Sequence, residues 1–551
     1  MKIIFMLEKQ SSQNPETGKS LGRSASIVSL AIMASRLLGL VREKVIAHYF
    51  TAAVGADAFT AAFRIPNLIR ELFAEGALSK AFITTFTDTE AKEGASAANL
   101  LANRVFILTA LVLSIITAAG IWGTPFIVQT MLPGDGFAIP LNPVEHYGFT
   151  TKGELTIFLA RIMFPFLMLV SFAAIVMGIL NTKKIFGIPA LASAFFNIGT
   201  ILGGIAGYYW GPNFQLHPST GLALGVLAGG IMQFVVQLPS LFKTGFRFRF
   251  SFSLRDERVR QVMLLMGPAI LGTAAFTIGI FINSIFASTG VGWMTWLNRA
   301  FRLMHLPLGV FGVAISTVAL PNFARLVAEN NIAGFRDGLQ RALRLSFFLT
   351  IPAMLVLMIL AEPICRLIFE GGKTGPADTA QTARALFFYA LAIAGYSAAK
   401  ITTDGFYAFK DTRTPMIISA VTVSLNIGLN YIFVYHIFQT HWSLALSTGI
   451  TQSLNFLLLI FFLRKKTGHL GLEKSGPFLP KLLSCCVIFA FTLYYVYAFL
   501  VAYFNTGGML MQLLHLSFTL GLSGIVFLLM GNLFKIEEAV SVMRVFGKLK
   551  R

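Results

Sequence analysis

Charged residues are scarce in this sequence: Asp, Glu, Lys and Arg together make up 12% of its 551 residues. Soluble globular domains carry about a quarter charged residues, so that class is excluded. Segments of about ten alternating polar and apolar residues do not recur, which argues against an outer-membrane barrel. Cysteine is nearly absent, and Cys365, Cys485 and Cys486 lack metal-ligand spacing. They suit small apolar packing positions rather than a disulfide framework or a zinc site.

Long apolar runs dominate what is present. Hydrophobic residues make up 56% of the chain, and its mean hydropathy is +0.73. Runs of roughly 20 apolar residues, the length that crosses a hydrocarbon core of about 30 Å, recur from Ile27 to Leu533. We therefore predict an all-α polytopic membrane protein with about fourteen transmembrane helices.

Basic residues are distributed unevenly along the chain. Lys and Arg number 44 against 24 Asp and Glu, which gives a formal net charge of +20. If the amino terminus is cytoplasmic and the predicted spans follow, most basic loop residues lie on the cytoplasmic side, and chiefly Lys152 and Lys373 lie on the other. This positive-inside asymmetry predicts that both termini are cytoplasmic. It also explains the charge without a nucleic-acid partner.

Two segments outside the spans have their own character. Residues 1–23 contain too short an apolar stretch for a signal peptide, so we expect a cytoplasmic tail. Residues 246–260 belong to the stretch KTGFRFRFSFSLRDERVR, in which aromatic and basic residues alternate between two spans. This pattern suits a linker that lies on the membrane surface against anionic lipid. Topology alone is the alternative explanation of its charge.

A moderate internal repeat relates the two halves of the chain. Gly178–Gly199 and Gly405–Gly428 each contain a helix end, a short basic turn, a proline that opens the next helix, and Asn-Ile-Gly. A repeat of this length holds about six spans, which predicts two six-helix lobes and two additional C-terminal helices. Alternating-access transporters are built in this way, with the substrate site at midplane. Chance recurrence of a common helix-turn-helix pattern is the alternative.

Several polar residues lie inside the first predicted span. An arginine at the centre of a lipid-exposed helix costs about 2.5–3.5 kcal/mol, so such residues usually face a bundle interior or a watery cavity. Ser35 and Arg42 fall on one line of this helix. Arg36 and Glu43 fall on the neighbouring line, so the four residues predict one polar face.

The second span and its counterpart in the other half continue this pattern. The second span contains Asp57, Arg64, Asn67, Arg70, Glu71 and Glu75, and its counterpart contains Arg299 and Arg302. Because the planar fork of arginine binds phosphate bidentately, a cavity lined by arginines predicts an anionic, phosphorylated head group. For Arg64, Glu71 and Arg299, a structural pairing at a helix interface is the alternative.

Three stretches carry a family resemblance. ASRLLGLVRE, DAFTAAFRIPNLIRELFAEGALSKAF and RLMHLPLGVFGVAISTVALP closely resemble the MurJ (MviN) family of lipid II flippases, within the MOP exporter superfamily. The resemblance implies two lobes around a cationic cavity and a groove for the polyprenyl tail in the last two helices. The predicted division is a tail at 1–23, an N-lobe at 24–245, a basic interfacial linker at 246–260, a C-lobe at 261–466, the last two helices at 467–535 and a cytoplasmic tail at 536–551.

The resemblance also implies substrate-binding residues. The matching positions are Ser35, Arg36, Arg42, Glu43, Asp57, Asn67, Arg70, Glu75 and Arg302. An aspartate that some members place directly before the last of these is Phe301 here, so the role of that carboxylate is absent or moved. No catalytic residue is implied.

Some members of the family have a sodium site in the second lobe. The corresponding positions are Asn283, Asn426, Asn430 and Thr448. Asparagine replaces a family aspartate at Asn283 and Asn430, and a cation needs anionic oxygen, which argues against sodium coupling here. Hydrogen bonding between helices explains Asn426 and Asn430 equally well. No cofactor is implied, and a monovalent cation or the membrane potential are the alternatives for an energy source.

The resulting prediction is a lipid II flippase of the bacterial cytoplasmic (inner) membrane that serves peptidoglycan and cell wall biogenesis. Its predicted partners are lipid II, membrane lipids and cell-wall synthesis proteins. A polysaccharide-lipid or drug exporter of the same superfamily is the alternative, although a cationic cavity disfavours cationic drugs. An enzyme acting on polyprenyl diphosphates would need paired aspartates for Mg²⁺, which the spans lack. His305 suits hydrogen-bonded packing better than catalysis.

Overall fold

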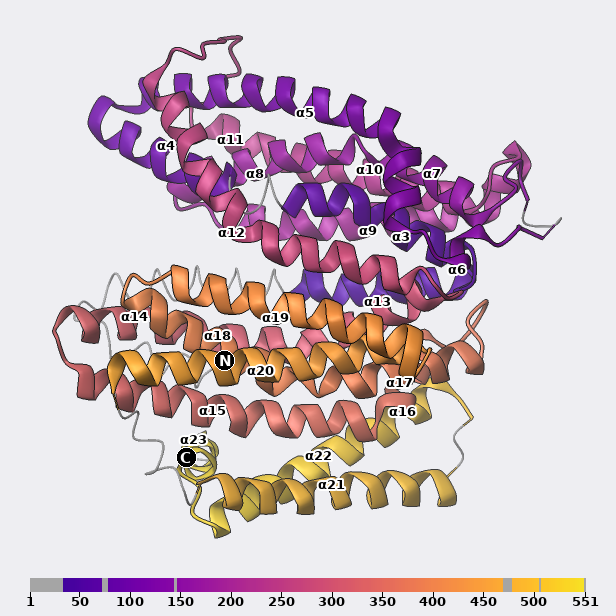
Figure 1. Cartoon of the computed structure of the whole chain (residues 1–551), viewed down its shortest axis with the longest axis vertical. Coiled ribbons are helices and arrows are strands. Elements are labelled where there is room, and N and C mark those ends of the chain that lie inside the picture. Colours follow the sequence, from indigo (N-terminus) through magenta and orange to yellow (C-terminus); the bar gives the residue numbers. More distant parts are fainter. Residues whose placement is uncertain (1–32, 72–77, 143–145, 469–477, 505–506, 550–551) are drawn as a thin grey trace. The chain divides into compact units, whose positions relative to one another are not determined.

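A computed structural model describes residues 33–71, 78–142, 146–468, 478–504 and 507–549, without the side chains of 80, 268–269, 271–276 and 544–549. In these ranges the regular structure is helical, as Figure 1 shows. The predicted tail at 1–23 and the predicted site residue Glu75 lie outside them.

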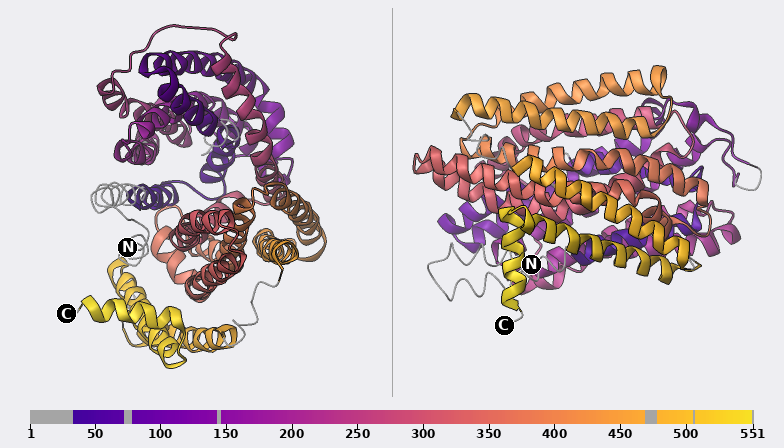
Figure 2. Two further views of the ribbon diagram at one scale, coloured as in Figure 1. Left: turned by 90° about the vertical axis from the view of Figure 1, so that its left-hand side faces the viewer. Right: turned by 90° about the horizontal axis from the view of Figure 1, so that it is seen from below.

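The chain forms two compact units. The first ends at Thr295 and includes Gly371–Thr374, and the second comprises Trp296–Glu370 and Gly375–Arg551. Figure 2 (left) shows the helices of each unit nearly end-on. The helices of the first unit are one at 33–49, α3 (Gly55–Arg70), α4 (Ser79–Glu93), α5 (Ala95–Met131), α6 (Asp135–Ala138), α7 (Lys152–Met163), α8 (Phe166–Thr182), α9 (Gly187–Trp210), η2 (Gly211–Phe214), α10 (Ser219–Val235), α11 (Leu238–Lys243) and α12 (Glu257–Ala287).

Helix α13 (Trp293–Pro307) begins at the end of the first unit and continues into the second. The further helices of the second unit are η3 (Leu308–Gly312), α14 (Val313–Ala328), α15 (Ile332–Ile359), α16 (Ala361–Phe369), α17 (Pro376–Ala390), α18 (Ala392–Ala408), α19 (Arg413–Ile432), η4 (Phe433–Ile437), α20 (Trp442–Thr467), α21 (Phe478–Tyr503), α22 (Met509–Leu533) and α23 (Glu537–Leu549).

The units differ from the predicted lobes in the placement of α12. The repeat predicted that this helix belongs to the C-lobe. In the structure, Val259 and Val262 of α12 are buried in a core of the first unit together with Leu101 and Phe106 of α5. The predicted boundaries of the two lobes stay a prediction.

Eleven helical segments in the described ranges are long and apolar enough to cross a membrane. They are Ala95–Met131, Lys152–Thr182, Gly187–Phe214, Ser219–Lys243, Trp293–Ala328, Ile332–Ile359, Pro376–Ala408, Arg413–Ile437, Trp442–Thr467, Phe478–Tyr503 and Met509–Leu533. The prediction of an all-α polytopic membrane protein is therefore confirmed. The number fourteen stays a prediction.

A seam of glycines joins α9 to α10 in the first unit. The two helices approach so closely that a Cβ atom added to Gly203 would lie 2.4 Å from the carbonyl oxygen of Gly221. A Cβ atom on Gly221 would likewise lie 2.4 Å from the Cα atom of Gly207. Small residues let membrane helices pack backbone against backbone. Because lipid is itself apolar, the hydrophobic effect does not drive this association, and van der Waals contact stabilises it instead. The seam holds these two spans in one fixed packing.

Aromatic packing holds the C-terminal helices of the second unit. The ring of Phe527 in α22 lies 5.1 Å from that of Phe348 in α15 and 5.4 Å from that of Phe489 in α21, measured between centroids. Cys485 and Cys486 are buried in the same core. These cysteines occupy packing positions, as the sequence predicted.

Candidate functional site

Arg42 and Glu43 form a buried ion pair in the helix at 33–49. The Nη2 atom of Arg42 donates to Oε1 of Glu43 at 2.9 Å, and the two residues are only 5% and 4% exposed. The Arg42 guanidinium also lies 5.3 Å from the ring centroid of Phe196 in α9. Aromatic faces attract cations, more strongly where water is excluded. The arginine thus contacts both a carboxylate and an aromatic ring.

Ser35 lies on the same helix and contacts α9. The hydroxyl of Ser193 donates to Oγ of Ser35 at 3.0 Å, and the amide of Asn197 donates to the carbonyl oxygen of Ser35 at 3.1 Å. Arg36 is exposed. The predicted polar face therefore splits in the structure, with Ser35 bonded to a neighbouring helix and Arg36 accessible.

Asp57 sits at the start of α3 in a fully buried network. Its carboxylate accepts hydrogen bonds from Nζ of Lys152 at 2.8 Å, the backbone N–H of Gly292 at 3.2 Å, and the N–H and hydroxyl of Thr295 at 2.9 and 3.0 Å. Both carboxylate oxygens of this buried side chain therefore have hydrogen-bond partners. This arrangement favours a role in positioning α7 and the start of α13, and substrate binding by Asp57 stays a prediction.

The remaining polar residues of α3 divide between local and interhelical contacts. The amide of Asn67 donates to Oε1 of Glu71 at 2.8 Å, one helical turn along. Nη1 of Arg64 donates to Oγ of Ser284 in α12 at 3.0 Å. The interface role left open for Arg64 therefore matches the observed contact. Arg70 is half-buried.

The two arginines of α13 have different surroundings in the second unit. Arg299 is 1% exposed, and its guanidinium lies 5.5 Å from the ring centroid of Phe369. Arg302 is half-buried. The resemblance places an aspartate at Phe301, whose ring centroid lies 4.0 Å from that of His305, with the two rings tilted by 44°. His305 Nδ1 lies 3.0 Å from the carbonyl oxygen of Phe301, which is the hydrogen-bonded packing role predicted for it.

The predicted sodium positions of the second unit form a neutral hydrogen-bond cluster between α19 and α20. The amide of Asn426 donates to the hydroxyls of Ser447 at 3.2 Å and Thr451 at 3.3 Å, while the amide of Asn430 donates to Oδ1 of Asn426 at 3.2 Å. Thr448 donates to the carbonyl oxygen of Leu444 at 2.8 Å. The bonds of Asn426 to Ser447 and Thr451, and a bond from the Ser447 hydroxyl to Oδ1 of Asn430, join α19 to α20, as the alternative drawn from the sequence predicted. The other two bonds each lie within one helix. Asn283 belongs to the first unit.

The structure brings some predicted site residues together and leaves others as predictions. Ser35, Arg42 and Glu43 lie on one helix against α9 in the first unit. Arg302 belongs to the second unit. That Arg302 shares a cavity with the arginines of the first unit stays a prediction.

Two buried charged residues were missed by sequence reasoning. Lys152, which ion-pairs with Asp57, was noted as a lone lysine on the side poor in basic residues, and that isolation was the available signal. Asp404 is a buried acid in the apolar helix α18 and accepts a hydrogen bond from Ser316 of α14. An ionisable residue within a span is itself a signal of a specific partner.

Known proteins similar to this chain include members of the lipid II flippase MurJ family. The family model described as Lipid II flippase MurJ matches residues 46–515. A "Probable lipid II flippase MurJ" from Vibrio cholerae is 36% identical over 443 residues, which cover 80% of this chain and 82% of that relative. The "Lipid II flippase MurJ" of Burkholderia cenocepacia is 34% identical over 466 residues, covering 83% of this chain and 86% of that relative.

Solved structures share the fold. A lipid II flippase MurJ in an inward closed conformation matches with a TM-score of 0.72 at 24% identity, covering 92% of this chain and 98% of that one. An inward-facing multidrug resistance MATE transporter of the MOP superfamily matches with a TM-score of 0.65 at 16% identity, covering 81% and 98%. The fold is therefore the one shared by these transporters.

Proposed function

Because the chain belongs to the lipid II flippase MurJ family, we propose that it moves lipid II from the cytoplasmic to the outer leaflet of the bacterial inner membrane. The chain is a multi-pass membrane protein, and its family consists of transporters rather than enzymes. Alternating access of two lobes would expose the head group to each side in turn while the polyprenyl tail stays in the bilayer. The positive-inside asymmetry supports cytoplasmic termini.

The observation that carries this proposal is the buried pair of Arg42 and Glu43 beside Phe196. A buried arginine that already has a carboxylate partner is electrostatically balanced when no substrate is present. A diphosphate has several oxygens that can accept hydrogen bonds from the Arg42 guanidinium, so it would compete with Glu43 for this arginine. Exchange of the internal carboxylate for the substrate's phosphate couples binding to a rearrangement of this helix. Arg36, Arg70 and Arg302 are the further arginines proposed to bind the diphosphate.

The membrane potential is the proposed energy source. It contributes about 2.3 kcal/mol per elementary charge per 100 mV. A cavity with several net positive charges would therefore be driven between its two states by the potential. The neutral cluster of Asn426 and Asn430 supports this source over sodium.

The test is depletion of the protein in its host, followed by measurement of lipid II accessible from outside. Wild-type protein should restore outward lipid II, whereas Arg42→Ala and Arg302→Ala should fail although the protein is present at normal levels. Arg366→Ala is the matched control, because Arg366 pairs with Glu362 on the exposed surface of α16. If the amount of lipid II accessible from outside stays normal after depletion, the proposed flippase activity is refuted. If Arg42→Ala and Arg302→Ala both restore it fully, the proposed binding site is refuted.

A further inference from the structure

The segment between α11 and α12 in the first unit is non-helical and has an amphipathic sequence. We call residues 246–255 the strap. Phenylalanine and arginine or serine alternate from Phe246 to Ser253, and in an extended chain successive side chains point to opposite sides. Phe246 is buried, but Phe248 and Phe252 are 46% and 48% exposed, and Phe250 is 89% exposed. The strap thus exposes apolar surface chiefly at Phe250, while Phe246 is buried and the ring of Phe248 lies 5.3 Å from that of Phe106 in α5.

Buried polar groups of α5 hold the backbone of the strap in place. The side chain of Asn103 is paired on both sides: its amide donates to the carbonyl oxygen of Arg247 at 3.1 Å, and its Oδ1 accepts from the N–H of Arg249 at 2.7 Å. Farther along, Nε of Arg104 donates to the hydroxyl of Ser251 at 3.2 Å. The strap is therefore a fixed part of the fold, and its conformation does not depend on the side chains of Arg247 and Arg249.

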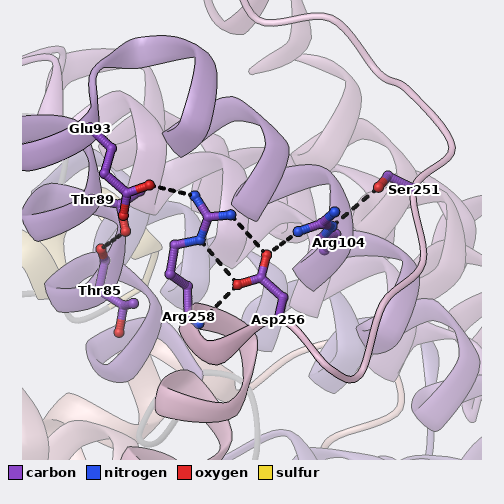
Figure 3. Close-up of polar contacts among 7 residues, drawn as sticks. All are labelled: Thr85, Thr89, Glu93, Arg104, Ser251, Asp256 and Arg258. Carbon is purple, nitrogen blue, oxygen red and sulfur yellow. Dashed lines mark hydrogen bonds and ion pairs between the residues drawn. The ribbon is translucent and has the colours of Figure 1, made fainter.

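Two arginines at the end of the strap are fully paired within the protein. Figure 3 shows Arg258 between Asp256 and Glu93, and Arg104 between Asp256 and Ser251. The Arg258–Glu93 and Arg258–Asp256 distances are both 3.0 Å. Burial alone would raise the pKa of Asp256, but hydrogen bonds from Arg258 and Arg104 outweigh it and lower that pKa. Asp256 thus stays ionised and partly neutralises the charges of Arg104 and Arg258 at the end of the strap.

The three arginines of the strap itself have no such partner. Arg247, Arg249 and Arg255 are exposed, and within the described residues their side chains make no hydrogen bond or ion pair. Asp256 and Glu93 pair with Arg104 and Arg258, and the strap presents three further arginines to its surroundings.

The depth of the strap follows from the helices that hold it. At 1.5 Å per residue, the 37 residues of α5 extend about 55 Å, well beyond a hydrocarbon core of about 30 Å. The strap contacts α5 at Asn103 and Arg104, directly before the apolar run that begins at Val105. α12 begins with the charged residues Glu257 and Arg258. The strap thus lies where the spans leave the hydrocarbon.

We propose that the strap is a binding site for anionic phospholipid, in which Phe248, Phe250 and Phe252 enter the interfacial layer and Arg247, Arg249 and Arg255 bind lipid phosphates. An amphipathic segment at the bilayer boundary is stabilised by burial of its apolar side and by attraction of its basic residues to anionic lipid. Arginine is suited to phosphate because its fork donates two parallel hydrogen bonds. This site is separate from the proposed transport site, so each can fail without the other.

A fluorescent reporter tests this proposal in the full-length protein. Phe250→Trp places a tryptophan at the most exposed position of the strap, and the difference from the parent removes the signal of the five native tryptophans. The protein is reconstituted in phosphatidylcholine vesicles that contain phosphatidylglycerol, with bromine on the chains of one lipid or the other. We expect the reporter to be quenched more strongly by the brominated anionic lipid.

The arginines are tested in the same reporter. Each arginine contributes about a fivefold preference for the anionic lipid. Arg247→Gln, Arg249→Gln and Arg255→Gln together should therefore abolish the preference. Lys410→Gln, Arg413→Gln and Lys465→Gln together form the matched control, because they remove the same charge from other exposed positions and should leave the preference unchanged. The proposal is overturned if brominated lipid fails to quench and aqueous iodide does. It is equally overturned if the strap arginines can be replaced without loss of preference.

Discussion

The Nζ atom of Lys152 lies 2.8 Å from Oδ2 of Asp57, and neither side chain reaches the surface. Lys152 also donates to the carbonyl oxygen of Ala53 at 3.1 Å and lies 4.3 Å from the ring centroid of Phe137. Asp57 in turn binds the N–H groups of Gly292 and Thr295. One ion pair thus connects α3 and α7 to the residues that begin α13.

Lys152→Met should destabilise the protein strongly. Removal of one partner from a buried ion pair leaves an uncompensated charge, at a typical cost of about 3–5 kcal/mol. The double variant Lys152→Met with Asp57→Asn should recover part of this loss, because the remaining groups are then neutral. Thermal unfolding in detergent, arranged as a double-mutant cycle, measures both effects.

The matched control is Lys92→Met, because Lys92 pairs with Asp88 at a similar 2.9 Å but in an exposed position. Surface pairs contribute little to stability, so this variant should unfold at nearly the wild-type temperature. Equal unfolding temperatures for the Lys152 and Lys92 variants would show that the buried pair does not hold these helices together.

Acidification should destabilise the first unit through His217, in the turn between η2 and α10. Burial lowers the pKa of His217 from 6.5 to about 4, and its Nδ1 accepts the N–H of Ser219 at 3.1 Å, which requires that nitrogen to be unprotonated. The unfolded chain therefore binds a proton more readily than the folded one. Stability from this group is present above pH 6.5 and is lost as the pH falls toward 4, by about 2 kcal/mol at pH 5.

His217→Gln should reduce this pH dependence, measured as the change in unfolding free energy between pH 7 and pH 5. His146→Gln is the control. The Nδ1 atom of His146 also accepts a backbone N–H, that of Gly148 at 3.2 Å, but His146 is exposed. An unchanged pH dependence in the His217 variant would assign the acid sensitivity to other groups.

Local features of the site were predictable from the sequence, and its long-range partners were not. Helical spacing predicted one polar face of Ser35, Arg36, Arg42 and Glu43, and in the structure Arg42 pairs with its neighbour Glu43 while Arg36 is exposed. Asp57 and Lys152 lie 95 positions apart. Helical periodicity says which face a residue occupies but not which other helix packs against it.

The fold shows the same limit. Apolar length predicted a polytopic helical protein because a span must satisfy its backbone hydrogen bonds internally. The burial of Val259 and Val262 of α12 against α5 depends instead on tertiary packing, which no internal repeat encodes. Likewise, Gly203 and Gly221 are recognisable as small residues, but their mutual approach follows only from the packing of α9 on α10.

Asn430→Asp should create a response to sodium that the wild type lacks. The substitution adds an anionic oxygen beside Asn426 and the hydroxyls of α20, and Asn430 is fully buried. A cation that binds only the folded state stabilises it by about 1.4 kcal/mol at ten times its dissociation constant. Unfolding temperatures in sodium, potassium and choline chloride at equal ionic strength measure this effect. A sodium-specific shift in the wild type would contradict the neutral cluster.

Gly203→Ala should destabilise the protein, although alanine is the better helix former by about 1 kcal/mol. The added Cβ atom would lie 2.4 Å from the backbone oxygen of Gly221, and backbone cannot turn aside as a side chain can. The helices must then separate along the seam, at an overpacking cost of about 1–3 kcal/mol that exceeds the gain in propensity. Gly123→Ala in α5 is the control, since nothing lies within 4 Å of its Cβ position, and it should be neutral or stabilising. If both variants raise the unfolding temperature equally in detergent, α9 and α10 do not pack through this seam.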